Sequence, residues 1–447
     1  MLHARRRPGG GPVRRASIRR PRRRPGAGVG GSRGGGDGPE LLSALASAAA
    51  PAPDPSALLA ETLTADAAAR IALARNPAFK VKLEEVGLAQ ADLSQAGILE
   101  NPRVHGQMRF AGGSGAAGHE FGVKVNLLDF VERPLRKRVA SQRLEQAKSR
   151  LGHEVLGLEA EARSAFYAHV AARRRLALRE QAVESLDAAV ELAERQRAAG
   201  NISALDLANE RASRQTAAAE LAHERSRAAA ARERLAMLLA IQDRADWTVP
   251  DELPAPPAVD PSSAAVEQAA LSQRWDLAAA RRDPQVLKDA LAVERLRFFG
   301  PLEVGVDTER EYSGESKFGP EFEIGIPIFE RRQASRARLA AQRRQSLASV
   351  ESLETAIRYE ARVTSAELAA AREAVAAYAK ALADRKEGIA ETLKNYNYML
   401  KGVYGLLEAK RLELDASSAY VDALKDYWSQ RAELERVAGG KLPDGGQ

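Results

Sequence analysis

The sequence predicts a mainly α-helical chain with a small β portion, in which a helix, a β-hairpin and a long helical hairpin occur twice. Three observations predict this fold class. Alanine-rich stretches run for tens of residues without a helix breaker, four short segments alternate apolar and polar side chains, and matching patterns recur about 200 residues apart. The chain has no cysteine, which excludes disulfides and thiolate metal sites.

Residues 1–61 are predicted to be a disordered Arg- and Gly-rich leader with a possible export signal. The 447 residues carry a formal net charge of +7, yet eleven Arg and a single acidic residue, Asp37, lie in residues 1–38. The full sequence has 67 basic and 60 acidic residues. Without residues 1–38 it has 67 − 11 = 56 basic and 60 − 1 = 59 acidic residues, a net charge of −3. The rest of the chain therefore forms no polyanion-binding surface. An arginine-rich nucleic-acid arm is one interpretation of the leader. A misassigned start codon or a long basic leader is the other, and we favour it, expecting no nucleic-acid partner.

The first predicted helix begins after Thr64, a good N-cap, with Asp66 in its first turn. It extends to about Leu99, with an adjustment at Asn76-Pro77, and Asn101-Pro102 ends it.

Four segments alternate apolar and polar residues with the period of a β-strand. Each has roughly 10 residues, the length of a tilted strand that crosses a bilayer. No apolar run is long enough for a transmembrane helix, so a crossing would require a closed barrel. Half-buried hairpins of a soluble domain are the alternative. The predicted strands are 103–111, 119–130, 302–310 and 320–329.

A long antiparallel helical hairpin follows the first strand pair. Its first helix is predicted from Pro134 to about Ala199 and its second from Ser203 to about Leu239, with a turn at Gly200-Asn201. A helix of roughly 65 residues is about 100 Å long, too long for one compact domain, so such helices should pack side by side in a ring. A seam with coiled-coil spacing supports this packing, formed by Leu151, Val155, Leu158, Ala162 and Ala165.

The pattern restarts after a Pro-rich linker at 247–263, which separates a first repeat (62–246) from a second repeat (264–437) and a tail (438–447). For example, Pro102-x-x-x-Gly106 matches Pro301-x-x-x-Gly305. Several such matches in the same order indicate duplication. Four strands per chain cannot close a barrel, so membrane strands would have to come from several chains.

This layout resembles the TolC-like family of outer membrane efflux channels over about residues 62–437. The resemblance implies a homotrimer with a twelve-stranded transmembrane β-barrel and an α-helical periplasmic tunnel. It also implies a place in the outer membrane of a Gram-negative cell, in contact with its lipid. The partners would be a periplasmic adaptor protein and an inner-membrane RND pump. The resemblance rests on Leu63–Pro77, Asn101-Pro102, the two strand-to-helix entries at Phe130 and Phe329, and the two turns.

The stretch Tyr396–Ala409 is most similar to the cobalt–zinc–cadmium (CzcC-like) branch, which implies export of heavy-metal cations. The same fold could instead export drugs or secreted proteins. A soluble coiled-coil scaffold is the alternative from another class.

Two carboxylates match the family's channel gate by position, Asp206 and Glu408. Three copies of each near one axis would repel one another and attract cations. Alternatively, each is a solvated acid near a helix N-terminus, where the dipole favours it. The resemblance also implies adaptor contacts at the helical turns, although the glycines there could simply end a helix. The candidate contact residues are Gly200, Asn201, Ser203, Lys401, Gly402 and Tyr404.

We expect no catalytic residues, no cofactor and no metal site. None of the six histidines has the spacing of paired ligands. His105 is expected to face the lumen and His119 to lie near the hairpin loop.

Overall fold

The computed structural model describes residues 62–110, 117–241, 247–300, 302–311 and 313–442. All of them belong to one compact unit, residues 47–447. The predicted leader and half of the expected tail (443–447) lie outside the described residues, as does most of the first hairpin loop.

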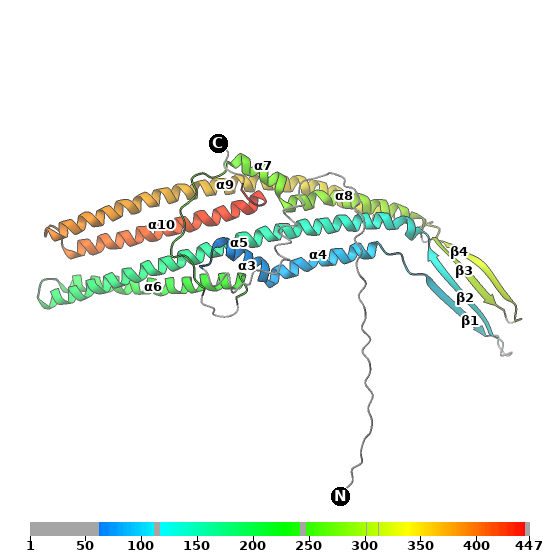
Figure 1. Cartoon of the computed structure of the whole chain (residues 1–447), viewed down its shortest axis with the longest axis horizontal. Coiled ribbons are helices and arrows are strands. Elements are labelled where there is room, and N and C mark those ends of the chain that lie inside the picture. Colours follow the sequence, from blue (N-terminus) through cyan, green and yellow to red (C-terminus); the bar gives the residue numbers. More distant parts are fainter. Residues whose placement is uncertain (1–61, 111–116, 242–246, 301, 312, 443–447) are drawn as a thin grey trace, which may run out of the picture. The chain divides into compact units, whose positions relative to one another are not determined.

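The same order of elements occurs twice (Figure 1). The predicted fold class, mainly α-helical with a small antiparallel sheet, is confirmed. The first series comprises α3 (Ala65–Arg75), α4 (Pro77–Ala96), β1 (Arg103–Phe110), β2 (Ala117–Asn126), α5 (Leu128–Ala198) and α6 (Ala204–Leu238). The second comprises α7 (Ser263–Gln273), α8 (Trp275–Leu296), the short 3₁₀ turn η1 (Arg297–Phe299), β3 (Leu302–Arg310), β4 (Ser316–Ile324), α9 (Gln333–Asn397) and α10 (Val403–Ala438).

The adjustment predicted at Asn76-Pro77 is a complete break between α3 and α4. Asn76 caps α4, since its Oδ1 accepts a hydrogen bond of 2.9 Å from the amide of Ala78. Its Nδ2 donates to the carbonyl of Leu238 at 3.1 Å, which ties this break to the end of α6. Pro77 occupies the first turn, where a missing N–H costs nothing.

Two strands, β2 and β4, differ from the prediction at both ends. β2 ends at Asn126 and α5 already begins at Leu128, because Oδ1 of Asn126 accepts a hydrogen bond of 3.0 Å from the Leu128 amide and turns the chain. The fourth strand is Ser316–Ile324 instead of 320–329. Its partner β3 begins at Leu302, which pairs with Ile324, so residues after 324 have no strand opposite them.

The four strands form one antiparallel sheet in the order β1-β2-β3-β4. Since side chains alternate along a strand, the register assigns each residue to one of two faces. We call them the polar face and the apolar face. Large apolar side chains exposed on the apolar face are Val104, Met108, Phe110, Phe121, Val306, Phe318, Phe322 and Ile324. The polar face carries Arg103, His105, Gln107, Arg109, Glu120, Lys124, Asn126, Glu303, Asp307, Glu309, Lys317, Glu321 and Glu323.

The long helices pair as hairpins, α5 with α6 and α9 with α10, and α5 also packs against α8 and α10 (Figure 1). Close approach of α5 to α8 depends on Gly152, because a Cβ there would lie 2.9 Å from ring atoms of Trp275. The Pro-rich segment packs onto these helices: Trp247 and Val249 are buried, and Nε1 of Trp428 donates to the carbonyl of Pro254 at 2.8 Å. None of the described helices combines the length and the apolar character needed to span a membrane.

Candidate functional site

The turn between α5 and α6 lies where the sequence predicted it. Gly200 adopts a left-handed conformation with φ of +79°, so any side chain there would be strained even though a Cβ would meet no atom within 4 Å. The amide of Asn201 donates to the carbonyl of Gln196 at 2.8 Å and closes the end of α5. Gly200, Asn201 and Ser203 are all exposed, as a contact surface requires.

Asp206, the first candidate gate carboxylate, forms a capping box with Ser203 at the start of α6. Its Oδ2 accepts hydrogen bonds from the hydroxyl of Ser203 at 2.7 Å and from the Ser203 amide at 3.0 Å. In return, the amide of Asp206 donates to Oγ of Ser203 at 3.0 Å. These bonds hold the pKa of Asp206 below its usual value. The carboxylate therefore has a local structural role and is ionised and exposed at neutral pH.

The turn between α9 and α10 carries a cluster of exposed large side chains that the sequence analysis missed. Met399 has a φ of +59° and is 94% exposed, and Tyr398 and Leu400 beside it are also exposed. Lys401 and Gly402, which were predicted as contact residues, follow directly and are exposed. The signal in the sequence was an apolar pair at a helix turn, a place where polar residues are usual.

Glu408, the second candidate gate carboxylate, is held by Arg411 one turn later on α10. Oε1 of Glu408 accepts from Nη2 of Arg411 at 2.6 Å, and Oε2 accepts from Nε at 2.8 Å. This bidentate pairing lowers the pKa of Glu408. Glu408 is exposed, but Arg411 offsets its charge, so a ring of three such residues would be less negative than the sequence alone implied.

Tyr404 connects the two turns. Its hydroxyl donates a hydrogen bond of 2.8 Å to Oε1 of Gln196, near the end of α5. Partial burial, followed by the charges of Glu210 and Asp206, raises the pKa of Tyr404. Since Asp206 acts on Tyr404, the structure brings the first turn and the start of α10 into one place. We call this region, residues 196–206 and 398–411, the tip.

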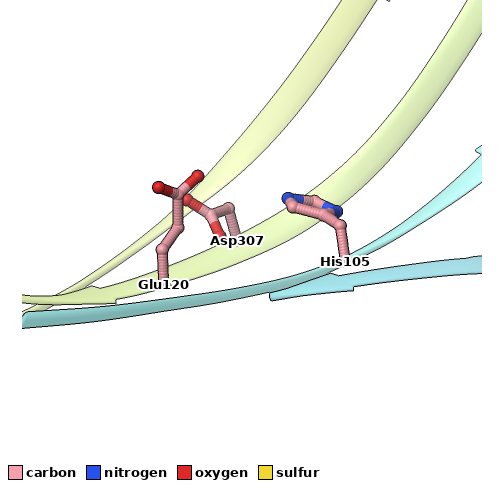
Figure 2. A group of neighbouring side chains, drawn as sticks. All are labelled: His105, Glu120 and Asp307. Carbon is pink, nitrogen blue, oxygen red and sulfur yellow. The ribbon is translucent and has the colours of Figure 1, made fainter. Parts of the chain in front are cut away.

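A second cluster lies on the polar face of the sheet. His105 on β1, Glu120 on β2 and Asp307 on β3 point toward one another (Figure 2). One possible ligand atom from each lies within 4.8 Å of the others. The sequence predicts no metal site here, because no histidine has the spacing of paired ligands. Only the pairing of β2 with β3 places Asp307 beside the other two.

Solved structures of membrane channels share this fold. The open-state MtrE outer membrane channel of Neisseria gonorrhoeae is 18% identical over 85% of this chain and 89% of its own, with a TM-score of 0.69. The outer-membrane channel OprN is 19% identical over 85% and 90%, also with a TM-score of 0.69. CusC, described in terms of transmembrane channel formation, is 17% identical over 84% and 92%, with a TM-score of 0.68.

A scan against protein-family models finds no match, and neither does a search of curated proteins. At this level of identity the likeness shows the fold: the chain has the architecture of outer membrane channels.

Proposed function

We propose that this chain is the outer membrane channel subunit of a tripartite efflux system. The observation that carries the proposal is the division of the sheet into two faces. Phe322 is 79% exposed and Phe110 76% exposed, and both lie on the apolar face with six other exposed large apolar residues. A patch of this kind on a soluble monomer would promote aggregation, whereas lipid would cover it favourably.

Trimerisation would remove the open edges of this sheet. β1 and β4 are its edge strands, and unpaired strand edges are not tolerated in a bilayer. If β4 of each chain pairs with β1 of the next, three chains of four strands form a twelve-stranded barrel. The polar face would then line the lumen. The helical hairpins would form the periplasmic tunnel, since α5 has 71 residues and is about 105 Å long.

The charge of the polar face supports a cationic cargo. Its described residues include six carboxylates and four Lys or Arg side chains, a net charge of −2 per chain. Three copies around a lumen would concentrate cations. Together with the resemblance of Tyr396–Ala409 to the heavy-metal branch, this favours export of heavy-metal cations over drugs or secreted proteins.

The tip is the proposed gate and docking end. Asp206 and Glu408 would narrow and charge the periplasmic entrance of the tunnel. The exposed turns, including Gly200, Lys401 and Gly402, would contact a periplasmic adaptor that links the channel to an inner-membrane RND pump. In this role the protein is a passive conduit without catalytic chemistry or a cofactor.

Expression of the full chain in an outer-membrane-containing host tests the proposal. We expect the protein in the outer membrane, extractable only with detergent, and trimeric by light scattering. In a host that lacks its own channel, co-expression with the cognate adaptor and pump should raise tolerance to cobalt, zinc or cadmium. Raised tolerance to drugs but not to metals would contradict metal export and indicate that the channel exports drugs. A water-soluble monomer or dimer would overturn it and favour the coiled-coil scaffold.

A further inference from the structure

Three strands of the polar face contribute possible metal ligands to one point. The register places His105, Gly122 and Asp307 side by side across β1, β2 and β3. Glu120 lies two residues before Gly122 on the same face of β2. The imidazole and the two carboxylates converge, as Figure 2 shows, with one possible ligand atom from each within 4.8 Å of the others.

The glycine at position 122 makes this convergence possible. A Cβ at residue 122 would lie 2.4 Å from Cε1 and 2.8 Å from Nε2 of His105, and 3.1 Å from Oδ1 of Asp307. Any other residue would therefore push the imidazole away from the carboxylate. The room above Gly122 is what lets side chains from two strands that are not neighbours meet over the strand between them.

Two carboxylate oxygens here are buried without a hydrogen-bond partner: Oδ1 of Asp307 and Oε2 of Glu321. An unpaired buried carboxylate oxygen is costly, and a cation is one way to satisfy it. Oε2 of Glu321 lies 3.8 Å from Nε2 of His105, while Oε1 of Glu321 pairs with Lys124 at 2.5 Å. The orphaned oxygen of Glu321 thus faces the imidazole from β4.

We propose that His105, Glu120 and Asp307 bind a divalent transition-metal cation such as Zn²⁺, with Glu321 as a fourth ligand. One imidazole and carboxylate oxygens suit zinc-like ions, whereas oxygen ligands alone would suit magnesium or calcium. Ligand atoms around tetrahedral zinc lie about 3.4 Å apart. The present separations, up to 4.8 Å, close with small rotations of partly exposed side chains.

The site is built for reversible occupancy. The side chains of His105 and Glu120 are 35% and 26% exposed, so a metal can enter and leave. Arg109 donates to Oε2 of Glu120 at 3.2 Å and competes with the metal for it. All the ligands come from one chain, so the inference goes beyond the proposed export function and does not require a closed barrel.

Isothermal titration of Zn²⁺ into the metal-free full chain in detergent at neutral pH tests the site. We expect saturable binding of one zinc per chain, and no comparable binding of Mg²⁺. His105→Ala and Asp307→Asn should each weaken Zn²⁺ binding at least tenfold. His119→Ala is the matched control, because His119 lies on the apolar face of β2 and its removal should leave the affinity unchanged.

A pair of glycine variants tests whether the room above Gly122 is needed for zinc binding, because neither variant removes a ligand side chain. Gly122→Ala should weaken Zn²⁺ binding as strongly as His105→Ala does. Gly106→Ala should not, since a Cβ at Gly106 meets its nearest atoms only at 3.7 Å and 3.8 Å. Circular dichroism and the oligomeric state verify that each variant is folded.

Absence of saturable Zn²⁺ binding to the folded protein would overturn the inference. Undiminished Zn²⁺ binding by folded His105→Ala would also overturn it. Equal binding of Mg²⁺ would overturn it as well, because it would show that the carboxylates alone bind the cation. Because the titration does not depend on conductance or metal tolerance, a failure here leaves the proposed channel function standing. Conversely, a soluble protein that binds zinc at this site would overturn only the channel.

Discussion

The hydroxyl of Tyr404, at the start of α10, donates a hydrogen bond of 2.8 Å to Oε1 of Gln196, near the end of α5. The two residues are 208 positions apart and belong to different repeats. This bond connects the two helical hairpins of one chain at the tip. If the tip opens and closes, the hairpins must either move together or break this bond.

Replacement of Tyr404 by Phe should loosen the tip. A neutral hydrogen bond contributes about 0.5–1.5 kcal/mol, so its loss should shift the ratio of closed to open channels roughly 2- to 10-fold toward open. Single-channel recording of open probability measures this. Tyr398→Phe is the matched control, because Tyr398 is exposed at the neighbouring turn. Equal open probability for wild type and Tyr404→Phe would show that this hydrogen bond does not affect opening of the channel.

The capping box of Asp206 should make the first turn sensitive to acid. The folded-state pKa of Asp206 lies below its ordinary value of 3.8, so its stabilisation is present above pH 3.8 and lost as the pH falls through the lower folded-state pKa. Hydrogen exchange of residues 203–206, corrected for intrinsic rates, should show protection that falls in this acidic range.

Asp206→Asn serves as the control for this titration. It should exchange faster than wild type at neutral pH and show no protection that depends on acid in that range. Wild-type protection that stays constant down to pH 2 would mean that the carboxylate does not stabilise the turn.

Two glycines of α5 should respond oppositely to alanine. Gly152→Ala places a Cβ 2.9 Å from the ring of Trp275, and we expect a loss of about 1–3 kcal/mol from overpacking. Gly157 has no atom within 4 Å of such a Cβ, so Gly157→Ala should gain about 0.5–1 kcal/mol from helix propensity. Thermal unfolding in detergent, followed by circular dichroism, compares the two. A stabilising Gly152→Ala would show that α8 does not press on α5 at this point.

A charge on the apolar face should hinder membrane insertion. Phe322→Arg should destabilise the membrane-inserted form by about 2–4 kcal/mol if the residue lies near the bilayer midplane. The fraction folded into lipid vesicles, resolved by the mobility shift of unheated samples on gels, measures this. Gln107→Arg, on the polar face, is the control and should insert normally. If both variants insert equally well, the apolar face does not contact lipid.

Much of the fold follows from local patterns in the sequence. The long helices are signalled by alanine-rich runs that end at Gly200-Asn201 and at Lys401-Gly402, and strand alternation gives the two faces of the sheet. The boundaries were less accurate where the partner decides them. β4 ends at Ile324 because its partner β3 begins at Leu302. The alternation of apolar and polar residues within 320–329 does not indicate where the partner strand begins.

The candidate sites were less predictable, because they depend on contacts between distant residues. Nothing near Gln196 in sequence indicated Tyr404, and nothing near His105 indicated Asp307. Both contacts arise because the second repeat folds beside the first, through α5 against α10 and β2 against β3. By contrast, the capping box of Asp206 with Ser203 is local, and the N-cap pattern of the sequence contains it.

Conductance of the purified protein in a planar bilayer tests the central claim most directly. The full chain, extracted from membranes in detergent and sized as a trimer, should insert and give discrete, cation-selective steps. Asp206→Ala combined with Glu408→Ala should reduce that selectivity at the tip. A folded protein that stays monomeric or dimeric without detergent and gives no conductance would contradict the account.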